Sequence, residues 1–365
     1  MPKITRSDVK VPGDVSAEAR ETYIDNYLKA TRETGRLMLF ACDQKIEHLN
    51  GDFFGSDIDI ADARPEHLFE IGAQGVCGIL AGQRGLIAQY APDYPDINYL
   101  VKMNSKTNLV KESQEDPYSP QLYSFEAVLE MIDNGINVVG IGYTIYLGSE
   151  YEAQMMAEAG ELIAQAHAAG LIVVLWMYPR GKAVPNEKSA HLIAGAAGTA
   201  LCLGADFVKV NPPKGKAEDE PVATSDLEAA IAEETGLVGA SLDAGELTAS
   251  QASAKKLIEA SAASGRTGLV CAGGSTVEAD VFLQQLWDQI HIGGARGNAT
   301  GRNIHQRSLD EAVRLTKAIS AITLSDASPE EAHDIFVGKK DYCLSCNEPS
   351  VDGPMYILEI TEIRF

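Results

Sequence analysis

Short apolar runs recur along this 365-residue chain, and stretches with helical periodicity separate them. Runs of about five to eight residues are typical of strands that are buried on both faces of a parallel sheet. Four of the helical stretches end at a glycine, which accepts the left-handed conformation that closes a helix. The predicted strands span residues 37–43, 76–80, 99–104, 138–142, 171–178, 207–211 and 268–273, with a weak, polar eighth at 295–301. The predicted helices span 123–134, 149–169, 186–203, 249–264 and 277–291, and the closing glycines are Gly135, Gly170, Gly204 and Gly265.

Eight successive strand–helix units predict an α/β fold, a closed (β/α)8 TIM barrel over residues 37–325. The alternative is an open sheet of about seven strands. A nucleotide-binding version of that sheet is disfavoured, because no G-x-G-x-x-G follows the first strand. Residues 1–36 are predicted to form a helical lead-in, and residues 326–365 a C-terminal extension. Its apolar finish, MYILEITEIRF, resembles an added strand or arm.

The charge balance limits the partners of the chain. Fifty-two acidic residues against thirty basic ones give a formal net charge of −22. This balance argues against nucleic acid, which is bound by Lys and Arg. An anionic substrate must therefore be held locally, by basic side chains and backbone N–H groups. No apolar run approaches the roughly 20 residues that cross a bilayer, and residues 1–20 lack the apolar segment of a signal peptide, so a cytoplasmic location is expected.

The cysteines give little indication of a metal site. Only Cys343 and Cys346, of six cysteines, form a C-x-x-C pair. A structural zinc site normally needs four ligands, and the sequence has no second pair. We expect two surface thiols there, and neither a metal nor a cofactor.

Polar side chains interrupt several of the predicted strands at positions that share one face. Side chains alternate along a strand, and reactive groups in such barrels lie at the carboxyl ends of strands and point inward. Lys209 shares its face with Phe207 and Asn211 in the sixth strand. The side chains expected to converge on one mouth are Asp43, Lys102, Trp176, Tyr178, Arg180 and Lys209.

Lys209 has two possible explanations. Burying an unpaired ammonium is costly, so a lysine within an apolar strand is neutralised, paired or used. Burial and a nearby cation lower its pKa, and the neutral amine attacks a ketone to form a Schiff base. The structural alternative is a buried salt bridge with Asp43 or Asp206. The aromatic and acidic partners on adjacent strands favour chemistry. Lys102 has the same ambiguity and is expected to lower the pKa of Lys209 or to hold a substrate hydroxyl.

Two glycine-containing turns suggest a phosphate site. Barrels frequently hold phosphate between the loops after strands seven and eight, with backbone N–H groups and a helix N-terminus. Glycine lets the backbone approach the anion, and arginine adds a charge-assisted hydrogen bond. The residues concerned are Gly273, Gly274 and Ser275 after strand seven, and Gly301 and Arg302 after strand eight.

Seven sequence segments together resemble the archaeal-type class I fructose-1,6-bisphosphate aldolases, the DhnA-like group that also occurs in bacteria. The segments are LFACDQKIEH, VKMNSKTNL, TIYLGSE, VVLWMYPRG, ADFVKVNPP, CAGGS and ATGRNIHQR. The resemblance runs in order from about residue 37 to residue 322. Its W-x-Y-x-R, F-V-K and G-R-N-x-x-Q elements are specific for the group, and less so for one member of it.

The resemblance implies a role for each matching residue. Lys209 matches the Schiff-base lysine, Tyr178 the tyrosine that moves protons, and Asp43 an aspartate that binds a hydroxyl and assists C–C cleavage. Trp176 and Arg180 match substrate contacts, and Gly273, Gly274, Gly301 and Arg302 match phosphate-binding positions. The family requires no metal, acts on phosphorylated sugars and usually forms large homo-oligomers.

The chain departs from the family pattern at two places. Gln44 and Lys45 stand where the family often has His-Gly, and Ala272 stands where it often has Ser. Ser275 is a possible substitute for that serine. Lys45 or Arg84 is a candidate for binding a second phosphate.

The predicted function is reversible cleavage of fructose 1,6-bisphosphate into dihydroxyacetone phosphate and glyceraldehyde 3-phosphate. Two rivals that keep the lysine are an amino-dideoxy-heptulosonate synthase and a thiolase acting on a phosphorylated dione. A third rival is a non-catalytic phospho-sugar binder, but sensing needs no amine nucleophile.

Overall fold

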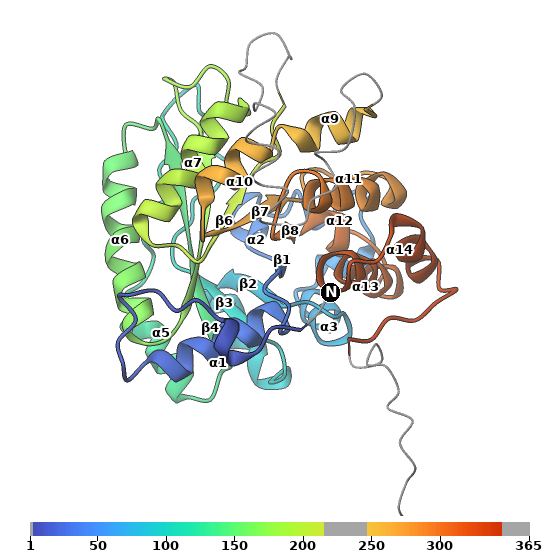
Figure 1. The fold of residues 1–365 in the computed structure, drawn as a ribbon, viewed down its shortest axis with the longest axis horizontal. Coiled ribbons are helices and arrows are strands. Elements are labelled where there is room, and N and C mark those ends of the chain that lie inside the picture. Colours follow the sequence, from blue (N-terminus) through green and yellow to red (C-terminus); the bar gives the residue numbers. More distant parts are fainter. Residues whose placement is uncertain (1–2, 215–246, 345–365) are drawn as a thin grey trace, which may run out of the picture.

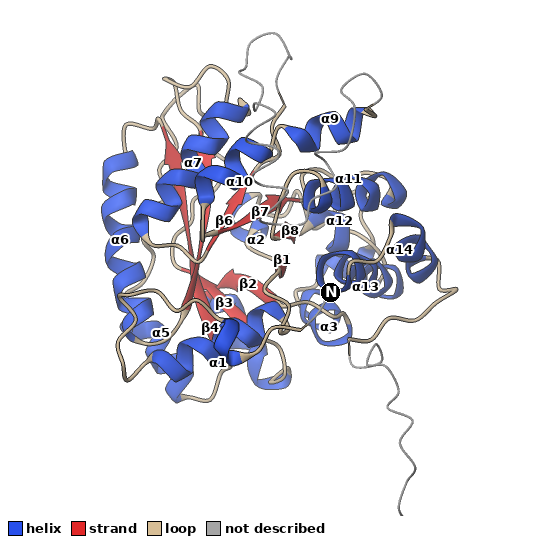
Figure 2. Ribbon diagram, viewed as in Figure 1, coloured by secondary structure: helices blue, strands red, loops and turns tan. Residues whose placement is uncertain are grey.

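Eight parallel strands close into a barrel in which each strand pairs with the next along the chain and β8 pairs with β1. The computed structural model describes residues 3–214 and 247–344. The TIM-barrel prediction is confirmed, and the polar eighth run is a strand (Figure 2). The strands are β1 Leu37–Ala41, β2 Ile79–Gln83, β3 Tyr99–Lys102, β4 Val138–Leu147, β5 Ile172–Pro179, β6 Phe207–Val210, β7 Gly268–Ala272 and β8 Gly297–Thr300.

Helices surround the barrel, as the ribbon in Figure 1 shows. The predicted helix over 249–264 is two helices, α9 and α10, since the chain turns at Lys256 and Leu257. The helices are α1 Arg20–Thr31, α2 Gln44–Glu47, α3 Glu66–Gln74, α4 Arg84–Tyr90, α5 Glu126–Asp133, α6 Glu152–Ala168, α7 Ala190–Leu203, α9 Ala249–Lys255, α10 Ile258–Ser264, α11 Ala279–His291, α12 Arg302–His305, α13 Leu309–Ser325 and α14 Pro329–Phe336. Three short 3-10 helices are η1 Arg6–Asp8, η2 Ile60–Ala63 and η3 Ala91–Asp93.

Two strands differ by three residues or more from their predicted bounds, and the others by one or two. β2 begins three residues later than expected, because the chain first passes under α1 at Gly78. A Cβ on Gly78 would lie 2.1 Å from the Ala30 carbonyl oxygen, so only glycine fits there. β4 runs five residues further than expected, because residues 143–147 continue to pair with β5. The longer β4 carries Tyr146 to the carboxyl end of the barrel.

All four closing glycines have positive φ, at +85°, +75°, +98° and +54° for Gly135, Gly170, Gly204 and Gly265, but Gly265, with ψ −116°, lies outside the left-handed helical region. Gly204 shows why this residue type is needed. Its N–H bonds to carbonyls in the last turn of α7 while its backbone is left-handed, which costs other residues energy. The chain then enters β6 directly.

The apolar residues form two layers. One layer fills the space between the strands and the helices, and the other fills the barrel interior. Trp176 and Phe207 belong to the interior layer, so Lys209, two residues after Phe207, faces inward as the parity argument predicted. α1 contacts β1, β4 and β5, and its Tyr23 and Ile24 join the interior layer. The predicted helical lead-in therefore closes the amino-terminal end of the barrel.

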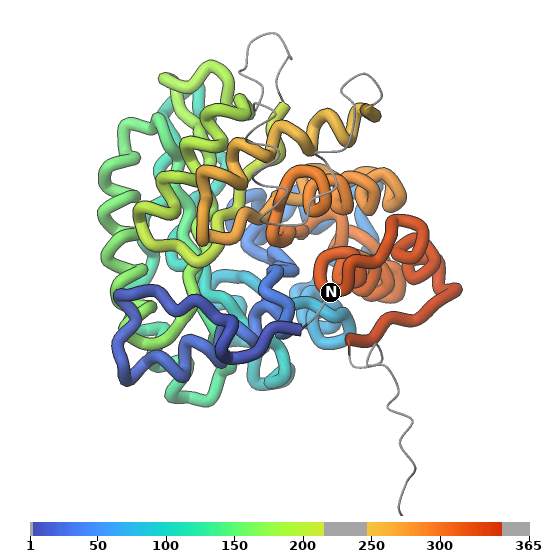
Figure 3. Tube along the Cα trace, viewed as in Figure 1, coloured from blue at the N-terminus to red at the C-terminus, as the bar shows by residue number. Residues whose placement is uncertain are grey.

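The chain beyond the barrel begins with α14, which packs against α11 and α13 (Figure 3). Ser328 caps this helix, since its hydroxyl accepts a hydrogen bond from the Glu331 N–H. The predicted strand or arm MYILEITEIRF lies outside the described residues, and so does Cys346. No helix in the described ranges is long and apolar enough to cross a membrane.

A buried polar network ties the lead-in to the barrel at Asp206. The Asp206 carboxylate accepts hydrogen bonds from the Tyr23 hydroxyl, from the Val173 N–H and from His167, whose other ring nitrogen bonds to Asp14. Burial alone would lower the pKa of His167, but Asp206 and Asp14 raise it to about 9. The imidazole is therefore protonated at neutral pH.

This network predicts a pH-dependent free energy of unfolding. Because the folded pKa lies above the unfolded value of about 6.5, the stabilisation is complete below pH ~6.5 and is lost as pH rises through about 9. It amounts to about 3 kcal/mol. Urea unfolding at pH 6 and pH 10 should show this loss in the wild type and not in His167→Gln. The control Tyr23→Phe should lose stability equally at both pH values, and a pH effect unchanged in His167→Gln would contradict the assignment.

Candidate active site

A cavity of about 160 Å³ opens at the carboxyl ends of the strands, where TIM-barrel active sites lie. Nine of the predicted site residues line it, from five strands or the turns after them: Asp43, Trp176, Tyr178, Arg180, Lys209, Gly273, Gly274, Gly301 and Arg302. The remaining lining residues are Gln44, Glu47, His48, Tyr146, Asn211, Ala272 and Ala299.

Lys209 lies at the floor of this cavity and is 5% exposed. Its ammonium nitrogen is 5.2 Å from the centre of the Trp176 ring. Within the described part of the chain, no carboxylate forms an ion pair with it, so the structural alternative of a salt bridge is not observed. Burial lowers the pKa of Lys209, and Lys102 and Arg302 lower it further, while Asp43 and Glu47 oppose them. These conditions favour the neutral amine.

The other buried lysine has the partner that Lys209 lacks. Lys102 is fully buried, and its nitrogen lies 3.6 Å from the Asp43 carboxylate and 3.8 Å from the centre of the Trp176 ring. It also donates a hydrogen bond to the Thr144 hydroxyl. Lys102 therefore lies below the cavity, beside Asp43, and acts on Lys209 through its charge. The Trp176 indole N–H is buried and has no partner among the described residues, so it is available to a substrate oxygen.

Two stacked tyrosines form one side of the cavity. The rings of Tyr146 and Tyr178 lie 6.3 Å apart, and the Arg180 guanidinium is 5.8 Å and 5.7 Å from their respective centres. Burial raises the pKa of Tyr178 well above its ordinary value, and Glu47 and Asp43 raise it further. The Tyr178 phenol is therefore protonated at neutral pH and can donate a proton.

Glu47 is a site residue that the sequence analysis did not identify. It lies at the end of α2, four residues after Asp43, and i,i+4 residues share one side of a helical turn. Burial and the neighbouring Asp43 raise its pKa, whereas Lys102 and Lys209 oppose them. The D-x-x-x-E spacing directly after the first strand was the available signal. Tyr146 was also missed, because strand four was predicted to end at residue 142.

The turns after β7 and β8 both border the cavity, but their glycines differ in environment. Gly274 has φ +69°, and a Cβ there would meet no atom within 4 Å, so its backbone faces open space. A Cβ on Gly301 would lie 2.5 Å from the Gln44 amide nitrogen and 2.6 Å from the Ala41 carbonyl oxygen. Glycine is therefore needed at position 301 for close packing against the end of β1.

Arg302 lies beside these turns. Its guanidinium donates a hydrogen bond to the Gly274 carbonyl oxygen at 3.2 Å and lies 3.6 Å from the Asp52 carboxylate, which also bonds to His48. His48 and Arg302 lower the pKa of Asp52 against the effect of burial. Asp52 thus holds Arg302 at the edge of the cavity. His48 lines that edge too.

Besides Lys102, three predicted or suggested contacts do not line the cavity. Ser275 is exposed, and its carbonyl oxygen accepts a hydrogen bond from Asn303. Lys45 lies with its nitrogen 4.0 Å from the centre of the Phe53 ring, and the Arg84 guanidinium donates to the Ala127 carbonyl oxygen. In the described part of the chain, no three His, Cys, Asp or Glu side chains gather into a possible metal site.

Comparisons with known proteins identify the family. Residues 37–307 match the DeoC/LacD family of aldolases. The chain is 50% identical to the fructose-bisphosphate aldolase/6-deoxy-5-ketofructose 1-phosphate synthase of Methanocaldococcus jannaschii, over 93% of this chain and 97% of that protein.

Solved structures give the same result. The fructose-bisphosphate aldolase from Slackia heliotrinireducens is 67% identical with a TM-score of 0.84, covering 94% of this chain and 98% of that one. A structure described as a Schiff base forming fructose-1,6-bisphosphate aldolase is 26% identical with a TM-score of 0.63, covering 82% and 98%. The chain therefore belongs to the DeoC/LacD family of aldolases, in its archaeal-type class I group.

Proposed function

We propose that the protein is a class I aldolase that reversibly cleaves fructose 1,6-bisphosphate into dihydroxyacetone phosphate and glyceraldehyde 3-phosphate. The observation that carries this proposal is a buried lysine, Lys209, with a lowered pKa and no carboxylate partner among the described residues, at the floor of a cavity. The names of the relatives support fructose 1,6-bisphosphate as the substrate.

The reaction begins with attack of the neutral Lys209 amine on the C2 ketone. Loss of water from the resulting carbinolamine gives an iminium, which withdraws electrons from C3. Asp43 binds the C4 hydroxyl and assists removal of its proton, so that the C3–C4 bond breaks and the aldehyde leaves. Asp43 is suited to this because Lys102 holds its carboxylate in place, 3.6 Å away.

The enamine that remains must gain a proton at C3. Tyr178 supplies it, because its high pKa keeps the phenol protonated until the carbanion-like carbon forms. Water then hydrolyses the iminium, which releases dihydroxyacetone phosphate and restores Lys209.

The two phosphates bind at opposite sides of the cavity. We assign one to Gly273, Gly274, Gly301 and Arg302, where backbone N–H groups and a guanidinium meet. We assign the other to Arg180 and Lys106, in place of the earlier candidates Lys45 and Arg84. The Lys106 amine nitrogen lies 5.9 Å from the centre of the Tyr146 ring. Burial lowers the pKa of Lys106, and the charge of Arg180 lowers it further, so the two cations are neighbours.

The charge of Lys102 predicts a pH effect on catalysis. Replacing it by Met removes a cation that lowers the pKa of Lys209 and frees Asp43, which raises that pKa. The acidic limb of the kcat/KM profile should therefore move to higher pH. In the control Thr144→Val, which removes only the hydrogen bond to Lys102, the limb should stay near its wild-type position. An unmoved limb in Lys102→Met would show that Lys102 does not tune the nucleophile.

A second candidate activity is synthesis of 6-deoxy-5-ketofructose 1-phosphate, because the 50% identical relative is named for both reactions. This product is formally the aldol adduct of dihydroxyacetone phosphate and a three-carbon keto-aldehyde, so the same enamine would serve.

The decisive assay incubates purified protein with fructose 1,6-bisphosphate and follows triose phosphate release. Rapid release supports the proposal. Parallel assays use dihydroxyacetone phosphate with the keto-aldehyde, and the substrates of the heptulosonate synthase and the dione thiolase. Turnover of only one of those alternatives would reassign the substrate.

We also propose a homo-oligomer in the cytoplasm, acting in glycolysis or gluconeogenesis. The large apolar side chains Phe54, Ile60 and Leu109 are 58%, 72% and 66% exposed, which suits contacts between subunits. The proposed substrate is a phosphorylated sugar of central metabolism, and this supports the proposed location and metabolic role.

A further inference from the structure

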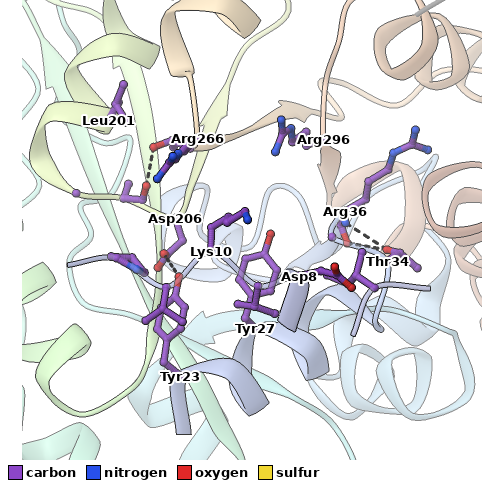
Figure 4. Close-up of a pocket in the computed structure, with 18 of the residues that line it drawn as sticks. Asp8, Lys10, Tyr23, Tyr27, Thr34, Arg36, Leu201, Asp206, Arg266 and Arg296 are labelled. Atoms are coloured by element: carbon purple, nitrogen blue, oxygen red, sulfur yellow. Dashed lines mark hydrogen bonds between the residues drawn. The ribbon is translucent and has the colours of Figure 1, made fainter. Parts of the chain in front are cut away.

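A second cavity, of about 570 Å³, lies at the opposite end of the barrel from Lys209. Residues 4–13 of the lead-in, which we call the N-terminal cover, form one wall. The other walls come from α1 and from the residues that precede β1, β6, β7 and β8 (Figure 4). The mechanism above uses none of these residues. The volume of this second cavity lies within the range of ~300–1,000 Å³ that is typical of small-molecule binding sites.

The cavity concentrates positive charge in a strongly acidic protein. Four cations line it, Lys10, Arg36, Arg266 and Arg296, against two carboxylates, Asp8 and Asp206, although the chain as a whole has 52 acidic and 30 basic residues.

The two carboxylates are already engaged elsewhere. Asp206 accepts hydrogen bonds from Tyr23, His167 and the Val173 N–H, and Asp8 accepts from the N–H and hydroxyl of Thr5. The charge of Asp206 is therefore offset by the protonated His167, whereas Asp8 keeps its charge close to Lys10.

The arginines differ in their partners. Arg36 pairs with Asp326 and points away from the other cations in Figure 4. Arg266 and Arg296 form no ion pair or side-chain hydrogen bond with residues 3–214 or 247–344. In the same view the Tyr27 hydroxyl and the Lys10 amine point toward the side of the cavity where Arg266 and Arg296 lie. Two guanidinium groups, an ammonium and a phenol thus line the same cavity.

We propose that this cavity binds a small phosphorylated anion, separately from the substrate site at the other end of the barrel. Planar guanidinium groups bind phosphate oxygens through paired, charge-assisted hydrogen bonds, and the Lys10 amine and Tyr27 hydroxyl add donors. Tyr27 is held in place by stacking on Phe207, with ring centres 5.8 Å apart. Four cations against two carboxylates, one of which is bonded to a protonated histidine, favour a multiply charged anion over a neutral ligand.

The test is calorimetric titration of the full-length protein with inorganic pyrophosphate at fixed ionic strength. The wild type should show two classes of site. Arg266→Gln and Arg296→Gln should each weaken one class by about tenfold or more, as expected for loss of a charge-assisted hydrogen bond. Arg302→Gln should weaken only the other class. Arg64→Gln, which makes the same charge change at an exposed position away from both cavities, should leave both unchanged.

Folding is checked by Tm without the anion. Because Arg266 and Arg296 are like charges that line one cavity, Arg266→Gln and Arg296→Gln should not lower Tm, whereas a purely structural role would lower it. The proposal would be overturned if the wild type showed only one class of pyrophosphate site and Arg302→Gln abolished that class. Binding that weakens equally in Arg64→Gln would overturn it too, as general charge attraction. Neither outcome depends on whether fructose 1,6-bisphosphate is cleaved.

Discussion

Lys209→Ala should lose at least about 10⁴-fold in kcat for cleavage of fructose 1,6-bisphosphate, because no other lysine of the described residues lines the cavity and could replace the covalent route. Lys102 is fully buried and ion-paired below the floor, and Lys45 lies outside the cavity. The loss should appear in kcat measured by triose phosphate release in a coupled assay.

The same variant should fold as well as the wild type. Burial lowers the pKa of Lys209, so the folded state holds this amine at a cost that the alanine variant avoids. Circular dichroism and Tm should therefore match or exceed the wild-type values. The matched control is Lys45→Ala, which should retain most of its activity. Near-normal turnover by Lys209→Ala would remove the basis of the proposed mechanism.

Tyr178→Phe should lower kcat by about 10²–10⁴-fold, the usual contribution of a general acid. The variant keeps the ring that stacks 6.3 Å from Tyr146 and removes only the hydroxyl whose pKa burial raises. Since Lys209 is untouched, imine formation should persist. Borohydride in the presence of dihydroxyacetone phosphate should still inactivate this variant.

Tyr146→Phe is the control for that experiment, since it removes the hydroxyl of the other stacked ring. We expect a much smaller loss of kcat. Equal losses in the two variants would mean that the phenols act together, and loss of trapping in Tyr178→Phe would place Tyr178 before imine formation.

The barrel was predictable because the spacing of apolar residues differs between its strands and its helices. Seven strands are mostly apolar on both faces, and closing glycines mark several helix ends. The weak eighth run is a strand because its polar groups are satisfied internally. Asn298 donates to the Thr323 hydroxyl and accepts from that of Thr300, which apolarity alone cannot reveal.

The sequence predicted those residues of the candidate site that lie on strands, because alternate residues of a strand share one face. Parity placed Lys209, Trp176 and Tyr178 on one face, and the cavity brings them together. Glu47 was missed because it depends on α2, a four-residue helix too short for a periodic signal. The pairing of Lys102 with Asp43, rather than Lys209 with Asp43, depends on the register of the closed barrel. The cavity at the amino-terminal end of the barrel could not be predicted, because it depends on how residues 4–13 pack over the strands. No local sequence pattern indicates that packing.

The most direct measurement is borohydride reduction of the protein with dihydroxyacetone phosphate, followed by peptide mass mapping. The mechanism predicts complete inactivation and one reduced adduct, on the peptide that contains Lys209. An adduct on Lys102 or Lys106, or full cleavage activity after reduction, would contradict it.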